Sequence, residues 1–248
     1  MTPKLILSAY DIIGFIADVQ TTYTENYKTL ESKHHWTGLD ARLQVFFQCA
    51  DVAGNARLSI ALITFARANG LNTKEWWGTW ACYDSERAFN RWPDFQVFID
   101  DKSRQYSHRV QEQLVVTIQI YVESFLRLLG RQFNIDRKEF WRLKNDFLES
   151  VLDFSDTDLV PLAVYQHLRN SLHNKGLHHN ANYPDLTFDV GGYRFDFNHG
   201  HIVRISWEHL TALLIATSNL LLRICENPKV VSLPSFDTQN IVVLTDDD

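Results

Sequence analysis

The residues best suited to chemistry lie between positions 165 and 176, in the run Tyr-Gln-His-Leu-Arg-Asn-Ser-Leu-His-Asn-Lys-Gly. Apolar residues recur every four positions here, which predicts a helix over roughly 159–174. Arg169 and His173 share this spacing and should lie one above the other, with Asn170 in the next row. A guanidinium donates charge-assisted hydrogen bonds to phosphate, and an imidazole exchanges a proton near pH 7. The segment is therefore a candidate phosphate site with Arg169, Asn170 and His173 as catalytic residues.

Four further residues could support this site: Glu123, Tyr165, Asn174 and His178. Glu123 is an acid in an otherwise apolar stretch, and it could pair with Arg169 and fix its direction if their helices touch. The same segment also fits an ordinary helix C-terminus. His173 and Lys175 would then face the negative end of the helix dipole, and Gly176 would take the left-handed conformation that ends many helices. The residues alone leave both interpretations open.

Around these residues the sequence resembles the HEPN superfamily, which is named for higher eukaryotes, prokaryotes and nucleotide binding. The resemblance rests on Arg169-Asn170 followed by His173-Asn174 and Gly176, and then on a hairpin pattern and a long apolar helix. The stretch Ile-Tyr-Val-Glu-Ser-Phe-Leu-Arg-Leu at 120–128 also fits the family's early helix. Together these features cover residues 104–225. Fewer residues separate Arg169 from His173 than the catalytic pattern of the family usually has.

The resemblance implies a metal-independent endoribonuclease, as many members are in toxin–antitoxin, abortive-infection and CRISPR systems. His173 would be the general base on a ribose 2′-hydroxyl, Arg169 would stabilise charge on the phosphorane, and Asn170 would orient the phosphate. His178 is the other candidate base. The resemblance also implies RNA as substrate, a homodimer, an antitoxin or defence partner, and no cofactor. The alternative is a non-catalytic HEPN-like module that dimerises through its apolar helix at 207–224 and binds RNA or a nucleotide.

The elements that must position these residues are mostly helical. We expect helices at roughly 5–31, 39–50, 53–69, 104–129, 137–154, 159–174 and 207–224, and a tryptophan-rich irregular stretch at 72–101. Alternating apolar residues flank Gly191-Gly192 and predict a two-residue hairpin, to which 201–205 could add a third strand. The expected fold is mainly α, a HEPN-like helical bundle with a small antiparallel β-hairpin inserted before the last long helix. The expected regions are an N-terminal helical region (1–101), the bundle (102–228) and an acidic tail (229–248).

Composition limits the classes of protein that fit. The 248 residues carry 24 Lys and Arg against 30 Asp and Glu, a formal charge of −6, which argues against a protein that coats nucleic acid or anionic membranes. Residues 102–144 are locally basic and could line an RNA path or form a solvated helical face. No CxxC pair occurs and the loop histidines lack a neighbouring carboxylate, so no metal site is expected. No signal peptide or membrane span is expected, which favours a soluble protein of the reducing cytoplasm.

Overall fold

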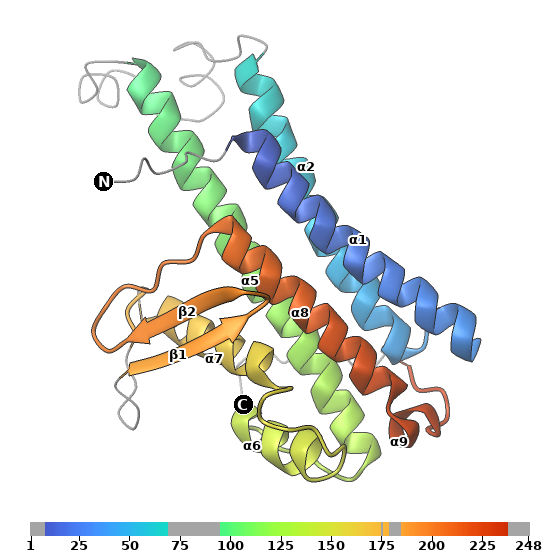
Figure 1. Ribbon diagram of the computed structural model, residues 1–248. Coiled ribbons are helices and arrows are strands. Elements are labelled where there is room, and N and C mark those ends of the chain that lie inside the picture. Colours follow the sequence, from blue (N-terminus) through green and yellow to red (C-terminus); the bar gives the residue numbers. More distant parts are fainter. Residues whose placement is uncertain (1–7, 69–94, 175, 179–184, 238–248) are drawn as a thin grey trace.

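The computed structural model describes residues 8–68, 95–174, 176–178 and 185–237, except for the side chains of Gln96 and His173. These residues form helices and one small antiparallel sheet, which confirms the mainly α fold with a hairpin (Figure 1). The helices are α1 (Ala9–His34), α2 (Ala41–Ala68), α5 (Phe95–Gln132), α6 (Phe140–Leu143), the π-helical η1 (Lys144–Glu149), α7 (Val160–His173), α8 (Trp207–Glu226) and α9 (Pro228–Val231). Strands β1 (Asp185–Val190) and β2 (Tyr193–Asn198) lie between α7 and α8.

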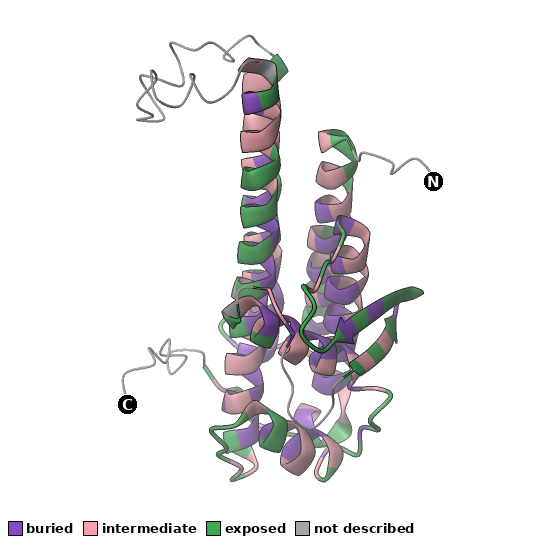
Figure 2. Cartoon of the chain, turned by 90° about the vertical axis from the view of Figure 1, so that its left-hand side faces the viewer, coloured by how far each residue is buried: buried purple, intermediate pink, exposed green. Residues whose placement is uncertain are grey.

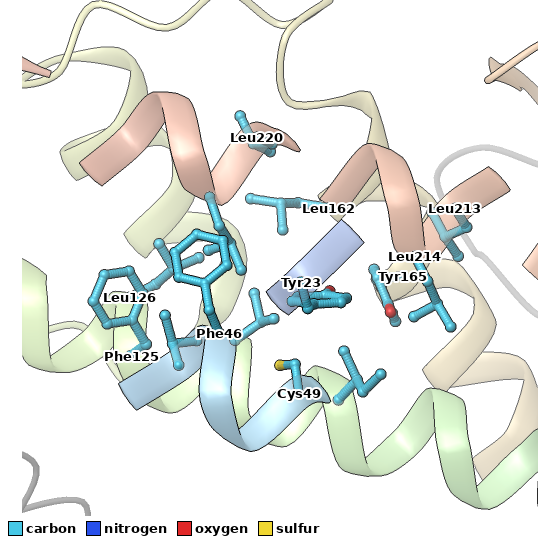
Figure 3. Close-up of a cluster of buried hydrophobic side chains, with 14 of the residues drawn as sticks. Tyr23, Phe46, Cys49, Phe125, Leu126, Leu162, Tyr165, Leu213, Leu214 and Leu220 are labelled. Carbon is cyan, nitrogen blue, oxygen red and sulfur yellow. The ribbon is translucent and has the colours of Figure 1, made fainter. Parts of the chain in front are cut away.

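Four long helices form the body of the molecule, with α1 packed on α2 and α8, and α2 packed on α5 (Figure 1). Buried residues concentrate where the helices face one another, and the outer faces are exposed (Figure 2). Side chains of α1, α2, α5, α7 and α8 converge in one hydrophobic core (Figure 3). The expected boundary between 101 and 102 falls inside α5, and the helices before and after it share this core.

The long helices are more continuous than the sequence pattern predicts. A single helix, α2, replaces the two expected at 39–50 and 53–69. Gly54 lies within it, and a Cβ there would come within 2.8 Å of the Gln20 amide of α1, so this glycine allows close packing and does not end a helix. Likewise, α5 begins at Phe95 and continues past Gly130 to Gln132. Of the tryptophan-rich irregular stretch predicted at 72–101, residues 72–94 lie outside the described residues. Residues 95–101 are not irregular but form the first turns of α5.

The elements around the predicted site also differ in their bounds. The helix expected at 137–154 is shorter, with α6 and η1 together covering 140–149. Helix α7 begins at Val160. The carboxylate of Asp158, just before it, accepts hydrogen bonds from Ser155 and Arg223. At the other end of α7, Gly176 has a φ of +85° and its N–H donates to the Ser171 carbonyl at 2.7 Å. The predicted left-handed glycine is therefore confirmed.

The hairpin forms as predicted. β1 and β2 pair antiparallel from Asp185↔Asn198 to Val190↔Tyr193, and both turn glycines have positive φ, +57° at Gly191 and +82° at Gly192. The third strand expected at 201–205 does not form, and only an isolated bridge joins Leu177 to Ile202. The sheet therefore has two strands in the described part of the chain.

The first part of the expected acidic tail, from Lys229 to Asp237, is attached to the body of the molecule. Val230 is buried, and the carbonyls of Val230 and Leu233 accept hydrogen bonds from the buried Arg42 at 2.9 and 3.3 Å. Arg42 also forms a two-point ion pair with the buried Asp40, at 2.8 and 2.6 Å. The hydrogen bonds from Arg42 and an isolated bridge between Asp40 and Asp237 hold the C-terminal segment against the start of α2. Residues 238–248 lie outside the described residues.

One described helix, α2, is long and apolar enough to cross a membrane by length and composition. Core helices of soluble proteins pass the same test, so this is weak support for a membrane span. The helix packs on both α1 and α5.

Candidate phosphate site at the end of α7

The predicted contact between Glu123 and Arg169 is present. Nη1 of Arg169, near the end of α7, lies 3.1 Å from Oε2 of Glu123 on α5. The Glu123 side chain is 15% exposed, whereas that of Arg169 is 42% exposed. The Glu123 carboxylate is therefore held within the protein, while the Arg169 guanidinium that it contacts still faces solvent.

Arg127, which was not among the predicted site residues, completes this arrangement. Its Nε lies 3.2 Å from Oε1 of Glu123, one helical turn away on α5. It also donates hydrogen bonds to the carbonyls of Arg137 and Lys138 in the loop after α5. Glu123 thus lies between two guanidiniums, and the three side chains together carry one positive charge. The i, i+4 spacing of Glu123 and Arg127 could have revealed this pair from the sequence.

The amide residues of the motif lie near the exposed end of α7. Asn170 and Asn174 are both exposed, and the Asn170 carbonyl accepts a hydrogen bond from the Asn174 N–H at 3.2 Å. His173 is the last residue of α7, four positions after Arg169, and its side chain lies outside the described residues. The described part of the site therefore consists of Glu123, Arg127, Arg169 and the two exposed amides.

Two of the predicted supporting residues are buried elsewhere. The Tyr165 side chain is 1% exposed and lies in the core with Tyr23 and Cys49 (Figure 3). This burial raises the pKa of Tyr165 well above its usual value. His178 is also 1% exposed, and its ring packs against His167 and Phe197 with centroid distances of 5.5 Å. Neither side chain lies on the solvent-facing surface with Arg169.

A cluster of four rings joins α7 to the hairpin, and His167 is at its centre. The His167 ring lies 5.6 Å from Phe188, 5.3 Å from Phe197 and 5.5 Å from His178. Burial, with a smaller contribution from His178, lowers the pKa of His167 to about 4. His167 is therefore neutral at pH 7, and it serves to pack the hairpin on α7.

Five of the nine basic residues at 102–144 form ion pairs with acids, and the longest of these pairs joins Arg142 to Glu139 at 3.9 Å. Arg127, Arg131, Arg137 and Lys144 each form an ion pair with a carboxylate, on Glu123, Asp136, Asp146 and Glu149 respectively. This pairing favours the solvated helical face over a continuous basic groove. Lys138 and Arg142 are exposed near the start of α6.

A polar hollow of about 350 Å³ lies at the C-terminal end of α8, and it contains none of the predicted site residues. Arg223 crosses it to Asp158 at 2.6 Å, and hydrogen bonds from Ser155 and Arg223 lower the pKa of Asp158 to about 2. Of its other charged side chains, Asp153 pairs with Lys229 and Glu226 pairs with Lys33.

Among the described residues, no group of three or more His, Cys, Asp or Glu side chains is placed to hold a metal ion. Comparison of the chain with protein-family models, curated proteins and solved structures gives no match.

Proposed function

We propose that this chain is a HEPN-like protein that binds RNA at Arg169 and cleaves it without a metal or cofactor. The observation that carries the proposal is the Glu123–Arg169 ion pair, which holds a guanidinium at the exposed end of α7 beside Asn170. A fixed and solvent-facing guanidinium is suited to a phosphodiester. The resemblance of residues 104–225 to the HEPN superfamily points to the same chemistry.

In this proposal His173 removes the proton of a ribose 2′-hydroxyl, and the 2′-oxygen attacks the adjacent phosphorus. Arg169 stabilises the charge that develops on the phosphorane, and Asn170 orients the phosphate. The bond from phosphorus to the 5′-oxygen breaks, and that oxygen takes up a proton. One product ends in a 2′,3′-cyclic phosphate and the other in a 5′-hydroxyl.

The test is an assay of purified protein on single-stranded RNA with chelator present. We expect cleavage that is lost in Arg169→Ala and in His173→Ala. Arg57→Ala and His201→Gln are matched controls, since both residues are exposed and neither belongs to the motif or to the basic run at 102–144, and they should cleave normally. Absence of cleavage, or cleavage that persists in both motif variants, contradicts the proposal.

The alternative is a non-catalytic HEPN-like module that dimerises and binds RNA or a nucleotide. The helix expected to mediate dimerisation, α8, has its apolar residues buried in the core. The observation that favours this alternative is instead the exposed Phe47, Leu58 and Leu62 on α2. This alternative predicts a dimer, which sedimentation at several protein concentrations tests. It also predicts that RNA is bound and not cleaved.

The same proposal places the protein in the reducing cytoplasm, in a defence or toxin–antitoxin system with an antitoxin as partner. Cys49 and Cys225 support a reducing compartment, since both are free and buried. Co-expression with neighbouring genes, scored by rescue of growth, tests the partner.

A further inference from the structure

We propose that Trp141 is a stacking platform for a base of single-stranded RNA, and that Lys138 and Arg142 bind the flanking phosphates. This inference rests on the proposed function, because it extends the path of the RNA from Arg169 to the start of α6. It names the substrate class, a flexible single strand with an unpaired base.

The exposure of Trp141 is the first observation. Its side chain is 48% exposed, although tryptophan is highly buried on average in folded proteins. The adjacent Phe140 packs against the core and Leu143 is fully buried, so α6 is fixed against the body of the molecule. Trp141 is therefore held on a rigid element and offers a flat ring to solvent.

The charges around Trp141 are the second observation. The guanidinium of Arg142 lies 5.1 Å from the centre of the Trp141 ring, a cation–π distance. Among the described residues, the acid that pairs with Arg142 is Glu139, at 3.9 Å, and both side chains are half-exposed. Such an exposed pair is weak, so Arg142 can exchange this carboxylate for a phosphate. Lys138 is exposed in the loop just before α6. An exposed aromatic ring with one cation against it and another three positions earlier in the chain fits a nucleotide.

Arg127 connects this surface to the candidate phosphate site. Its guanidinium donates to the Lys138 carbonyl at 2.6 Å and also contacts Glu123, the residue that holds Arg169. Trp141 follows Lys138 by three positions, in the first turn of α6, at the end of the bundle where α5 ends (Figure 1). One short chain of hydrogen bonds therefore links the loop that carries Lys138 to Arg169.

The chemistry favours a single strand over a duplex. A base can stack on a protein ring only when its own face is free, and in a duplex neighbouring bases cover that face. Stacking is tolerant of sequence because every base has a π-face. We therefore expect weak base preference and a clear preference for unpaired RNA.

The experiment compares binding of a labelled oligouridine and of an abasic strand of equal length, which keeps the phosphates and lacks the bases. The wild-type protein should bind the oligouridine more tightly. Trp141→Ala should weaken oligouridine binding roughly 5- to 100-fold and leave binding of the abasic strand nearly unchanged. Trp141→Phe should retain most of the affinity, whereas Trp141→Leu, which keeps apolar bulk, should not. Tyr10→Ala, at an exposed aromatic on α1, is the matched control and should bind normally.

Each outcome bears on one proposal or on both. If Arg169→Ala loses RNA binding while Trp141→Ala and Trp141→Leu bind as the wild type does, the platform is overturned and the proposed function stands. If the wild type binds neither oligouridine nor duplex RNA, both proposals fail. Melting temperatures of the variants identify any loss of affinity that comes from unfolding. The RNA affinity of Trp141→Phe, compared with that of Trp141→Leu, then decides between an aromatic and an apolar role of the side chain.

Discussion

Glu123 of α5 and Arg169 of α7 are 46 positions apart in the chain, and their side chains meet at 3.1 Å. Glu123 also contacts Arg127, so one carboxylate organises two guanidiniums from different helices. This relationship gives α7 a defined position against α5. It also gives Arg169 a fixed direction at the surface, which a lone exposed arginine would not have.

Replacing Glu123 with Gln should separate two roles of this residue, the positioning of Arg169 and the negative charge that it adds to the site. We expect RNA cleavage to slow by roughly tenfold or more, because Arg169 is no longer held. RNA affinity should stay the same or rise, because a negative charge is removed. The free energy of unfolding should fall by about 1 kcal/mol, since the pair is partly exposed. Single-turnover kinetics and urea unfolding measure these quantities, with the exposed Glu112→Gln as control. Weaker binding with unchanged cleavage is the opposite of this expectation.

Tyr165→Phe tests whether Tyr165 supports the site. Its side chain is buried in the core, away from the surface that Arg169 faces. We expect RNA binding and cleavage to be unchanged, and the free energy of unfolding to change by no more than about 1 kcal/mol. A loss of cleavage in a variant that melts normally would show that this hydroxyl takes part in the chemistry.

Arg42→Met should be strongly destabilising. The change leaves the Asp40 carboxylate buried without its partner and removes the hydrogen bonds to the C-terminal segment. We expect a loss of about 3–5 kcal/mol in the free energy of unfolding, measured with urea. Lys33→Ala removes an exposed ion pair with Glu226 and should lose less than about 1 kcal/mol. Equal effects in the two variants would show that burial does not distinguish the pairs.

His167 predicts a pH dependence of stability. Its pKa is about 4 in the folded chain and should be about 6.5 in the unfolded chain. Above pH 7 both states hold a neutral ring, and this contribution to stability is constant. As the pH falls from about 6.5 to 4, the unfolded chain takes up the proton first, so stability decreases.

The measurement is the urea midpoint at pH 7, 5.5 and 4.5. His167→Phe should keep the ring packing and show a smaller decrease, while the exposed His201→Gln should behave as the wild type does. An equal decrease in stability in His167→Phe would show that groups other than His167 cause the pH dependence.

Periodicity predicted the mainly α fold, the hairpin and the left-handed Gly176, because these depend on local patterns. Local patterns could not show that α2 continues through Gly54, since the close approach to Gln20 is a tertiary contact. They also could not show that Asp158 pairs with Ser155 and Arg223. The attachment of the C-terminal segment by Arg42 was missed for the same reason.

The candidate site was predicted in part. The sequence indicated Glu123 as the partner of Arg169, and the structure shows that contact. The sequence did not show that Tyr165 and Arg169 lie in different environments, although a helix buries one side and exposes another within a single turn. Tyr165 lies four positions before Arg169, which suggested a shared environment, and α7 instead directs Tyr165 into the core and Arg169 to solvent.

The ends of the RNA products test the central claim most directly. With chelator present, mass spectrometry of cleaved single-stranded RNA should find 2′,3′-cyclic phosphate and 5′-hydroxyl ends, and Arg169→Ala should give neither. An RNA carrying 2′-O-methyl groups throughout should be bound and remain intact, because no 2′-hydroxyl is left to attack. Cleavage of the methylated RNA, or 5′-phosphate ends that depend on added metal, would contradict the account.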